Sequence, residues 1–263
     1  PVGHSKSPVI HRCFARQTGQ DIEFELIDIP PGQFEERLRA FRGRGGRGLN
    51  VTLPYKGEAF EFADQLTERA QSAAAVNTLA WRGDGRVLGD NTDGAGLVAD
   101  LEQNLGVELA DSQILLLGAG GAARGALGPL LARLPSRLIV ANRTMAKAGA
   151  LAERFAAAGN VVATGFDELV GQFDLIVNAT SASLAGQVPP VPASVVTART
   201  ACYDMMYQKG PTAFLEWAEG CGAGLLADGA GMLVEQAAES FELWRGVRPK
   251  TGPALAEIRH LLG

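Results

Sequence analysis

The sequence has 263 residues, enough for one large domain or two modest ones, and 46% of them are hydrophobic, which excludes a disordered chain. The formal net charge of −5 comes without a basic stripe, which argues against a nucleic-acid-binding protein. The three cysteines have no metal-ligand or CxxC spacing, so we expect no metal site and a reducing compartment, the cytoplasm. No apolar run reaches the roughly 20 residues of a membrane helix. The opening residues lack the apolar segment of a signal peptide, so we expect no membrane partner.

The first part of the chain predicts short helices and strands in alternation. A helix should start at Ser7, which can cap it, with Pro8 at its first position and Gly19 as its stop. The other elements expected here are a strand at 24–29, a helix at 33–41, a strand at 48–53, a helix at 64–74 and a hairpin with strands at 77–81 and 87–88.

From residue 93 onward, apolar strands alternate with longer helices. The expected elements are a helix at 97–105, a strand at 114–117, a helix ending at 131, a strand at 137–141, a helix at 145–157, a strand at 174–178 and a helix at 231–244. This repeat is typical of a doubly wound nucleotide-binding domain. We therefore expect two α/β domains around a cleft, one built from 1–92 plus 229–263 and the other, a Rossmann domain, from 93–228.

A glycine-rich turn, Gly118-Ala119-Gly120-Gly121-Ala122-Ala123, follows an apolar strand and opens a helix, and it fits the pattern G-x-G-x-x-A. Gly118 permits the tight turn, Gly120 lets the backbone approach a pyrophosphate, and the small Ala123 lets the helix pack close to the sheet. The free N–H groups of the helix then face the phosphates. In this context the turn predicts that the chain binds a dinucleotide.

The end of the next strand indicates which dinucleotide is bound. An NAD site usually places Asp or Glu there to bind the ribose 2′-hydroxyl. This strand instead ends in Asn142-Arg143-Thr144, and Lys147 follows. Arg can grip a 2′-phosphate with its planar fork and Thr can donate a hydrogen bond to it, so the pattern favours NADP. The alternative is a solvated pair of cations at a helix start.

Polar residues in the first part of the chain form several small groups. Ser5 and Ser7 lie at a helix N-terminus, a good seat for a small carboxylate, although Ser7 can also act only as an N-cap. Asn50 and Thr52 share one face of a strand, with Lys56 just beyond its end, where a lone lysine is usually on the surface. The segments 75–78 and 90–94 can be functional or simply a turn and a helix cap.

Taken together, these segments resemble the shikimate dehydrogenase family over essentially the whole chain. The matching motifs, in order, are His4-Ser5-Lys6-Ser7-Pro8, Asn50-Val51-Thr52-Leu53-Pro54-Tyr55-Lys56, Ala75-Val76-Asn77-Thr78, Gly89-Asp90-Asn91-Thr92-Asp93-Gly94, Gly118–Ala122, Asn142-Arg143-Thr144, Asn178-Ala179-Thr180-Ser181, 203–210 and 228–237. The resemblance implies NADPH-linked reduction of 3-dehydroshikimate to shikimate, in the pathway to chorismate and the aromatic amino acids. We expect only small-molecule ligands and a monomer or a homodimer.

The resemblance also implies roles for individual residues. The residues implied for substrate are Ser5, Ser7 and Tyr207 at the carboxylate, Thr52, Asn77 and Gln236 at the ring hydroxyls, and Lys56 with Asp93 as the catalytic pair, Asp93 also touching substrate. The residues implied for NADP are Gly118, Ala119, Gly120, Gly121, Ala122, Asn142, Arg143, Thr144 and Lys147, with Met205 and Gly229 by the nicotinamide and Glu68 bordering the cofactor. Reduction of a ketone needs a proton for the developing alkoxide, and lysine, ordinarily protonated at neutral pH, is the plausible donor.

The sequence departs from the family at three places. Family members begin with a strand ending in Gly-Asn-Pro, which we expect to be missing from this sequence because it starts at Pro1. Lys147 stands where relatives often have Arg, and Ser181-Ala182-Ser183 replaces a more usual Ser-Ser-Gly. Two alternatives stay open: a quinate/shikimate dehydrogenase that uses NAD, and a catalytically silent protein that binds pathway metabolites and regulates a partner.

Overall fold

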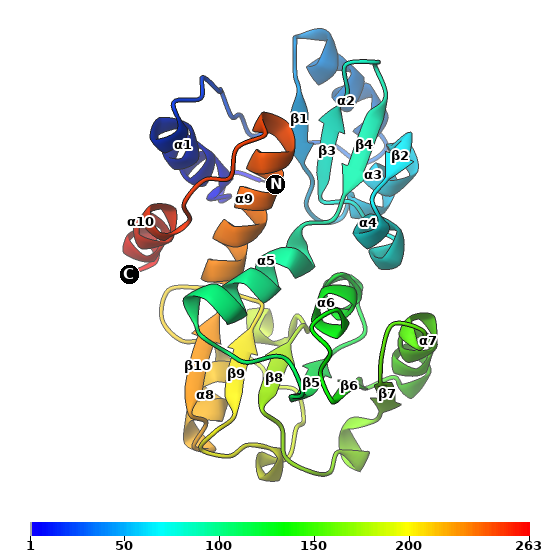
Figure 1. Ribbon diagram of the computed structural model, residues 1–263, viewed down its shortest axis with the longest axis vertical. Helices are drawn as coiled ribbons and strands as arrows, with labels where there is room; N and C mark the ends of the chain where they lie inside the picture. The colour runs from blue at the N-terminus through cyan, green and yellow to red at the C-terminus, as the bar shows by residue number, and fades with distance from the viewer. Residues whose placement is uncertain (1) are drawn as a thin grey trace.

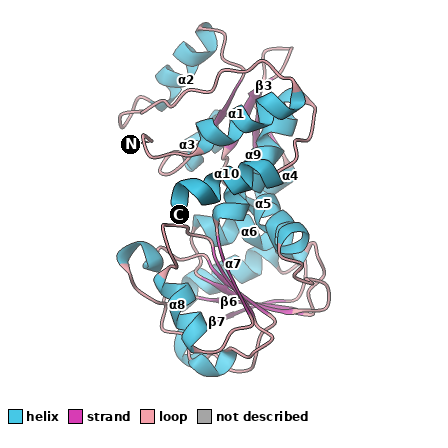
Figure 2. Ribbon diagram, turned by 90° about the vertical axis from the view of Figure 1, so that its left-hand side faces the viewer, coloured by secondary structure: helices cyan, strands magenta, loops and turns pink. Residues whose placement is uncertain are grey.

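The computed structural model describes residues 2–263, which form two separate β-sheets with helices packed around them (Figure 1). One sheet has four strands in the order β1-β3-β4-β2, and the other has six in the order β10-β9-β8-β5-β6-β7. The second view places α5, α9 and α10 in the middle of the molecule, between the two sheets (Figure 2). The predicted α/β fold class is thereby confirmed.

The four-stranded sheet is small and mixed. Its elements and their flanking helices are α1 (Ser7–Thr18), α2 (Phe34–Gly43), β1 (Gly48–Asn50), α3 (Lys56–Phe62), β2 (Gln65–Leu66), α4 (Glu68–Ala73), β3 (Thr78–Trp81) and β4 (Val87–Asp90). The predicted hairpin is confirmed, since β3 and β4 pair antiparallel, while β1 joins β3 antiparallel and β2 joins β4 parallel. The predicted stop of the first helix is also confirmed, because Gly19 is its left-handed C-cap.

Several predictions for this part were wrong in detail. No strand forms at 24–29 in the described chain; Phe24 instead stacks on the imidazole of His11, with ring centroids 4.4 Å apart. Lys6, not Ser7, is the N-cap of α1, and the hydroxyl of Ser5 accepts a hydrogen bond from the backbone N–H of Ser7. The helix predicted at 64–74 starts late, because Thr67 caps it by accepting from the N–H of Ala70. The helix α3 was not predicted.

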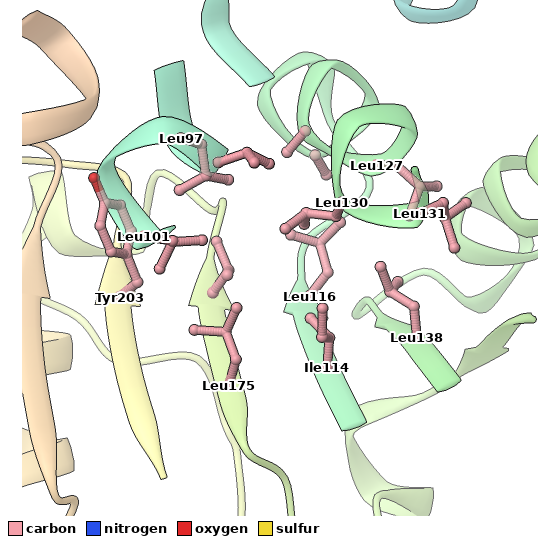
Figure 3. Packing of buried hydrophobic residues seen from close by; sticks show 14 of the residues in the cluster. Leu97, Leu101, Ile114, Leu116, Leu127, Leu130, Leu131, Leu138, Leu175 and Tyr203 are labelled. Carbon is pink, nitrogen blue, oxygen red and sulfur yellow. The ribbon is translucent and has the colours of Figure 1, made fainter. Parts of the chain in front are cut away.

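The six-stranded sheet is parallel throughout. Its elements are β5 (Gln113–Leu117), α6 (Gly121–Leu131), β6 (Arg137–Ala141), α7 (Met145–Phe155), β7 (Val161–Thr164), β8 (Leu175–Asn178), β9 (Ala201–Asp204), α8 (Ala213–Gly220) and β10 (Leu225–Asp228), with short 3-10 turns at Phe166–Glu168, Ala182–Ala185 and Ala193–Val195. Leu127 and Leu130 of α6 pack on one face, together with Leu97 (Figure 3). Phe214 of α8 belongs to the separate cluster on the other face. Burial on both faces explains the continuous apolar strands.

Helix α5 (Asp93–Ala99) runs between the two sheets and ends in a π-helix, Asp100–Asn104, where the sequence predicted an ordinary helix. Two glycines allow its close packing. A Cβ at Gly94 would lie 2.2 Å from the carbonyl oxygen of Gly125 in α6, and one at Gly96 would lie 2.6 Å from the backbone nitrogen of Gln236 in α9. Asp93, the first residue of α5, is therefore held at a fixed place between α6 and α9.

The long helix α9 (Ala230–Arg245) joins the C-terminal part of the chain to the first sheet region. Its buried face, which includes Val234 and Phe241, shares a core with Ile10 and Phe14 of α1 and with Ile258 of α10 (Gly252–Leu262). Residues from the two ends of the chain are thus packed into one cluster. The side chains near the N-terminus of α1 and those of α9 consequently belong to one region of the molecule.

Candidate active site and cofactor site

A lysine and an aspartate from different helices meet at the centre of the candidate active site. Lys56 is the first residue of α3 and Asp93 is the first residue of α5, and the Lys56 Nζ atom lies 2.5 Å from Asp93 Oδ2. Their side chains are 25% and 17% exposed, so a small molecule and solvent can still reach them. The structure therefore brings together the two residues for which a catalytic role was expected.

Asn77 fixes the other carboxylate oxygen of Asp93. Its Nδ2 donates to Asp93 Oδ1 at 2.8 Å and to Thr92 Oγ1 at 2.9 Å, and its Oδ1 accepts from the Thr92 N–H at 2.9 Å. Gln236 Oε1 lies 3.4 Å from the same amide nitrogen. Asn77 and Gln236 are almost fully buried. A polar side chain without a partner is costly in such a place, so this network holds the carboxylate in one orientation.

The hydrogen bonds continue from Asn77 into the core. Thr78 donates to Asn77 Oδ1 at 2.9 Å, Asn50 Nδ2 donates to Thr78 Oγ1 at 3.1 Å and to Ser240 Oγ at 2.9 Å, and Asn50 Oδ1 faces His11 Nε2 at 3.1 Å. Since the amide oxygen of Asn50 can only accept, His11 carries its proton on Nε2. Burial lowers the pKa of His11 to about 4, although the hydrogen bond with Asn50 acts in the opposite direction. The imidazole is therefore neutral at neutral pH.

The remaining residues expected at the substrate make no hydrogen bond to this network in the described structure. Ser5 and Ser7 are half-buried at the start of α1, and Thr52 is exposed. Tyr207 packs against the cluster shared by α1 and α9. Burial raises the pKa of Tyr207, and the nearby Asp228 carboxylate adds to this effect, so the phenol stays protonated and can donate to an anion.

The glycine turn at the end of β5 has the backbone that its motif requires. Gly118 has φ of +105°, and Gly120 is the N-cap of α6. A Cβ at Gly120 or Gly121 would meet no atom within 4 Å, and both glycines are exposed, so the start of α6 is open to solvent. Ala123, in the first turn of α6, is fully buried in the core between the helix and the sheet. This arrangement leaves the helix N-terminus able to receive a phosphate.

The end of β6 carries positive charge on exposed side chains. Arg143, Thr144 and Lys147 are exposed, and within residues 2–263 neither of the two cations has a carboxylate partner. Asn142 Nδ2 donates to the carbonyl oxygen of Thr144 at 3.0 Å, which fixes the loop, and Thr144 is the N-cap of α7. Two exposed cations on a loop held by a hydrogen bond have the charge that complements a phosphate group.

Met205 and Gly229 meet at the carboxyl ends of the neighbouring strands β9 and β10. The backbone N–H of Gly229 donates to the carbonyl oxygen of Met206 at 3.0 Å, and a Cβ at Gly229 would lie 2.2 Å from the carbonyl oxygen of Met205. Glycine is therefore required at this position. Glu68 is exposed at the first turn of α4, and no hydrogen bond joins it to either strand end in the described structure.

Comparison with known proteins agrees with this geometry. Three family models match: the shikimate dehydrogenase substrate binding domain at residues 1–79, shikimate / quinate 5-dehydrogenase at 100–186, and the shikimate 5′-dehydrogenase C-terminal domain at 229–259. The shikimate dehydrogenase (NADP(+)) of Nitrosospira multiformis is 56% identical over 264 residues, covering 100% of this chain and 96% of that protein. The chain belongs to the shikimate dehydrogenase family.

Solved structures share the whole fold of this shikimate dehydrogenase family member. An Ael1 enzyme from Pseudomonas putida matches with a TM-score of 0.93 at 47% identity, over 98% of this chain and 94% of that one. Shikimate 5-dehydrogenase from Thermus thermophilus, solved in complex with NADP(H) and shikimate, matches with a TM-score of 0.89 at 33% identity, over 100% and 97% of the two chains. The expected family membership is confirmed.

Two groups of polar contacts were not predicted from the sequence. Asp204 at the end of β9 accepts hydrogen bonds from Ser183 and Thr212, both at 2.6 Å. Arg69 donates to Asp90 through two nitrogens, Nε at 2.7 Å and Nη2 at 2.6 Å. Asp90 belongs to the motif Gly89-Asp90-Asn91-Thr92-Asp93-Gly94, but its partner Arg69 is 21 residues away, in an ordinary helical stretch. No spacing signal could have joined them.

The described part of the chain has neither a metal cluster nor a membrane span. Within residues 2–263, no three side chains of His, Cys, Asp or Glu gather in a way that could hold a metal ion. None of the helices in the same range has the length and apolar character needed to cross a membrane.

Proposed function

We propose that this chain catalyses the reversible NADPH-linked reduction of 3-dehydroshikimate to shikimate, in the shikimate pathway that leads to chorismate and the aromatic amino acids. The observation that carries the proposal is the Lys56–Asp93 contact of 2.5 Å, held in place by Asn77. The family membership and the NADP(+)-linked relatives support the same reaction, an oxidoreductase step.

Lys56 performs the proton transfer in this account. Its ammonium group polarises the ketone of the substrate and gives a proton to the oxygen as the negative charge develops there. NADPH, when bound, supplies the hydride to the ketone carbon. The resulting lysine amine is 25% exposed as a side chain, so it regains a proton from solvent. Asp93 holds the ammonium group in place through their 2.5 Å contact and orients a ring hydroxyl.

The substrate is held by groups around this pair. Ser5 and Ser7, with the protonated Tyr207, bind the ring carboxylate at the start of α1. The ring hydroxyls are bound by Thr52, Asn77 and Gln236. Because Asn77 already donates to Asp93 and to Thr92, a substrate hydroxyl that accepts from this amide takes the place of one of those contacts.

Most of the residues predicted from the sequence to bind NADP lie on or beside the six-stranded sheet. The open turn Gly118–Ala122 receives the pyrophosphate at the N-terminus of α6, while Asn142, Arg143, Thr144 and Lys147 bind the 2′-phosphate. The nicotinamide lies by Met205 and Gly229, and Glu68 borders the cofactor. The absence of a carboxylate at 142–147 supports NADP over NAD.

We assign residues 1–92 plus 229–263 to the substrate domain and 93–228 to the cofactor domain. The cluster shared by α1, α9 and α10 supports the return of the C-terminal segment to the first domain. We further propose a monomer or a homodimer in the cytoplasm, which fits the three unpaired cysteines Cys13, Cys202 and Cys221.

The two alternative functions are separated from this one by a single assay. Purified protein is mixed with NADP and shikimate, and the absorbance at 340 nm is followed; the same is done with NAD and with quinate. We expect turnover with shikimate and NADP and a much lower kcat/KM for the other three pairs. A preference for NAD with quinate would identify the quinate/shikimate enzyme, and binding without turnover would identify a metabolite-binding regulator.

A further inference from the structure

We propose that Arg69, which lies outside the substrate and cofactor residues, is a positioning residue that fixes the catalytic carboxylate of Asp93 through Asp90. This inference rests on the proposed function, since it concerns the same Lys56–Asp93 pair. Arg69 is on α4, and its guanidinium reaches the end of β4, where the segment leading to Asp93 begins.

The contact between Arg69 and Asp90 is a planar, two-pronged ion pair. Nε donates to Oδ1 at 2.7 Å and Nη2 donates to Oδ2 at 2.6 Å, while the side chains are 31% and 2% exposed. Thr67 also donates to Oδ1, at 2.6 Å. Burial by itself would raise the pKa of Asp90, but the hydrogen bonds and charge of Arg69 outweigh it and lower the pKa. Asp90 is therefore a buried anion whose charge depends on Arg69.

Asp90 determines where the next three residues lie. Its Oδ1 accepts from the N–H of Asn91 at 2.8 Å, and Asn91 Oδ1 in turn accepts from the N–H of Asp93 at 3.2 Å. Asn91 Nδ2 donates to the carbonyl oxygen of Ala75 at 3.1 Å. A shift of Asp90 is passed along this short chain of contacts to Asp93, whose carboxylate must stay within reach of Lys56, 2.5 Å away.

The third nitrogen of Arg69 reaches the helix that carries Gln236. Nη1 donates to Glu239 Oε2 at 2.8 Å, and Glu239 is one helical turn beyond Gln236 on α9. Burial opposes the charged form of Glu239, but Arg69 and Arg248 together lower its pKa. One guanidinium thus joins α4, the end of β4 and α9.

A second arginine anchors α4 without touching Asp90, and it offers a matched control. Arg154, on α7 of the other sheet, donates to the carbonyl oxygens of Ser72 at 3.0 Å and Gln71 at 2.8 Å at the far end of α4. Losing Arg154 loosens the helix, whereas losing Arg69 loosens the helix and frees Asp90. The comparison of the two variants therefore separates a general structural role from positioning of Asp93.

The test measures kcat, the KM for shikimate and the Kd for NADP in Arg69→Met, Arg69→Lys, Arg154→Met and Glu239→Gln, each assayed well below its own Tm. A small displacement of a reacting group costs on the order of 10²-fold in rate, so we expect a loss of that size in kcat for Arg69→Met with KM and Kd nearly unchanged. Arg69→Lys, which keeps the charge but not the fork, should recover part of the rate. Arg154→Met should keep near-normal kcat. Glu239→Gln keeps an acceptor for Arg69 Nη1 and leaves the Asp90 pair intact, so it should lose much less rate than Arg69→Met.

A near-normal kcat in Arg69→Met, or an equal loss in Arg154→Met, would overturn the inference. If Arg69→Met does not fold, Arg69→Lys still decides the matter, since it should lose kcat without losing affinity for either ligand. If the wild-type chain does not turn over shikimate, the proposed function fails. A crystal structure of the Arg69 variant then tests the inference alone: Asp93 should have moved away from Lys56, and an unchanged contact would contradict it.

Discussion

Around Lys56, the functional side chains are bonded to one another, whereas the cations at the end of β6 have no carboxylate partner among residues 2–263. Asp93 accepts hydrogen bonds from Lys56 and Asn77, and its chain segment is tied to Asp90. In the described structure, Arg143 and Lys147 are exposed and have no acidic partner. The first region has a geometry fixed by its own internal contacts, and the second has charge that a ligand can neutralise.

The difference reflects the two tasks. Groups that act on a reacting atom are most effective when they are oriented in advance, because no reorganisation is then needed during the reaction. A phosphate carries its own charge and needs only complementary cations on an ordered loop. We therefore expect changes around Lys56 to alter kcat and changes at the end of β6 to alter cofactor affinity and its dependence on salt.

The largest expected effect comes from Lys56→Ala. Loss of a general acid typically costs 10²–10⁴-fold in rate, so kcat for shikimate oxidation should fall by roughly this factor. The KM for shikimate should change little. The exposed Lys250 provides the control, since Lys250→Ala should behave like wild type. A near-normal kcat in Lys56→Ala would remove this residue from the chemistry.

The buried network around Asn50 should show its own pH dependence in stability. Burial lowers the pKa of His11 from 6.5 to about 4, so the unfolded chain takes up this proton first as the pH falls. Neutral His11 therefore contributes about 3 kcal/mol to the free energy of unfolding. This contribution is complete above pH 6.5 and is lost progressively as the pH falls toward 4. Denaturant unfolding of wild type and His11→Gln at several pH values measures it; parallel curves for the two proteins would contradict this account.

Loss of positive charge at the end of β6 should weaken the binding of NADP. Each of Arg143→Ala and Lys147→Ala should raise the KM for NADP by about tenfold, equivalent to ~1.4 kcal/mol, with a weaker dependence on salt. The KM for NAD should be nearly unchanged, because NAD lacks the 2′-phosphate. Equal losses for NADP and NAD would show that these residues hold the loop and not the phosphate.

The smallest expected effect is at the start of α1. Ser7→Ala should raise the KM for shikimate several-fold while kcat is retained, since the carboxylate is far from the reacting carbon and its contacts act in both ground and transition states. Ser72→Ala, at an exposed position on α4, is the control. A fall in kcat without a change in KM would place Ser7 nearer to the chemistry.

The two regions also differed in how well the sequence predicted them. The strand at Arg137–Ala141 was placed correctly because it is buried on both faces and its apolar run is unbroken. The stretch 24–29 has a similar composition but forms no strand in the described chain, because Phe24 packs on His11 and no backbone ladder joins it. Local pattern predicts a strand only where a neighbouring strand is available to pair with it.

The candidate site was predictable where motifs carry it and not where distant contacts do. Lys56, Asn77 and Asp93 lie in motifs, and the structure brings them within hydrogen-bonding distance. The bond from Arg69 to Asp90 and the π-helix at Asp100–Asn104 depend on packing between elements, which no local spacing reveals. In the π-helix, the carboxylate of Asp100 accepts a hydrogen bond from the hydroxyl of Tyr203 on β9 at 2.7 Å, so this contact joins the helix to the six-stranded sheet.

The most direct test of the central claim is the reaction in the biosynthetic direction. Purified protein is mixed with NADPH and 3-dehydroshikimate, the loss of absorbance at 340 nm is recorded, and the product is identified by chromatography. The account predicts that one NADPH is consumed for each shikimate formed and that Lys56→Ala abolishes nearly all of the rate. Binding of 3-dehydroshikimate without consumption of NADPH, or a product other than shikimate, would contradict it.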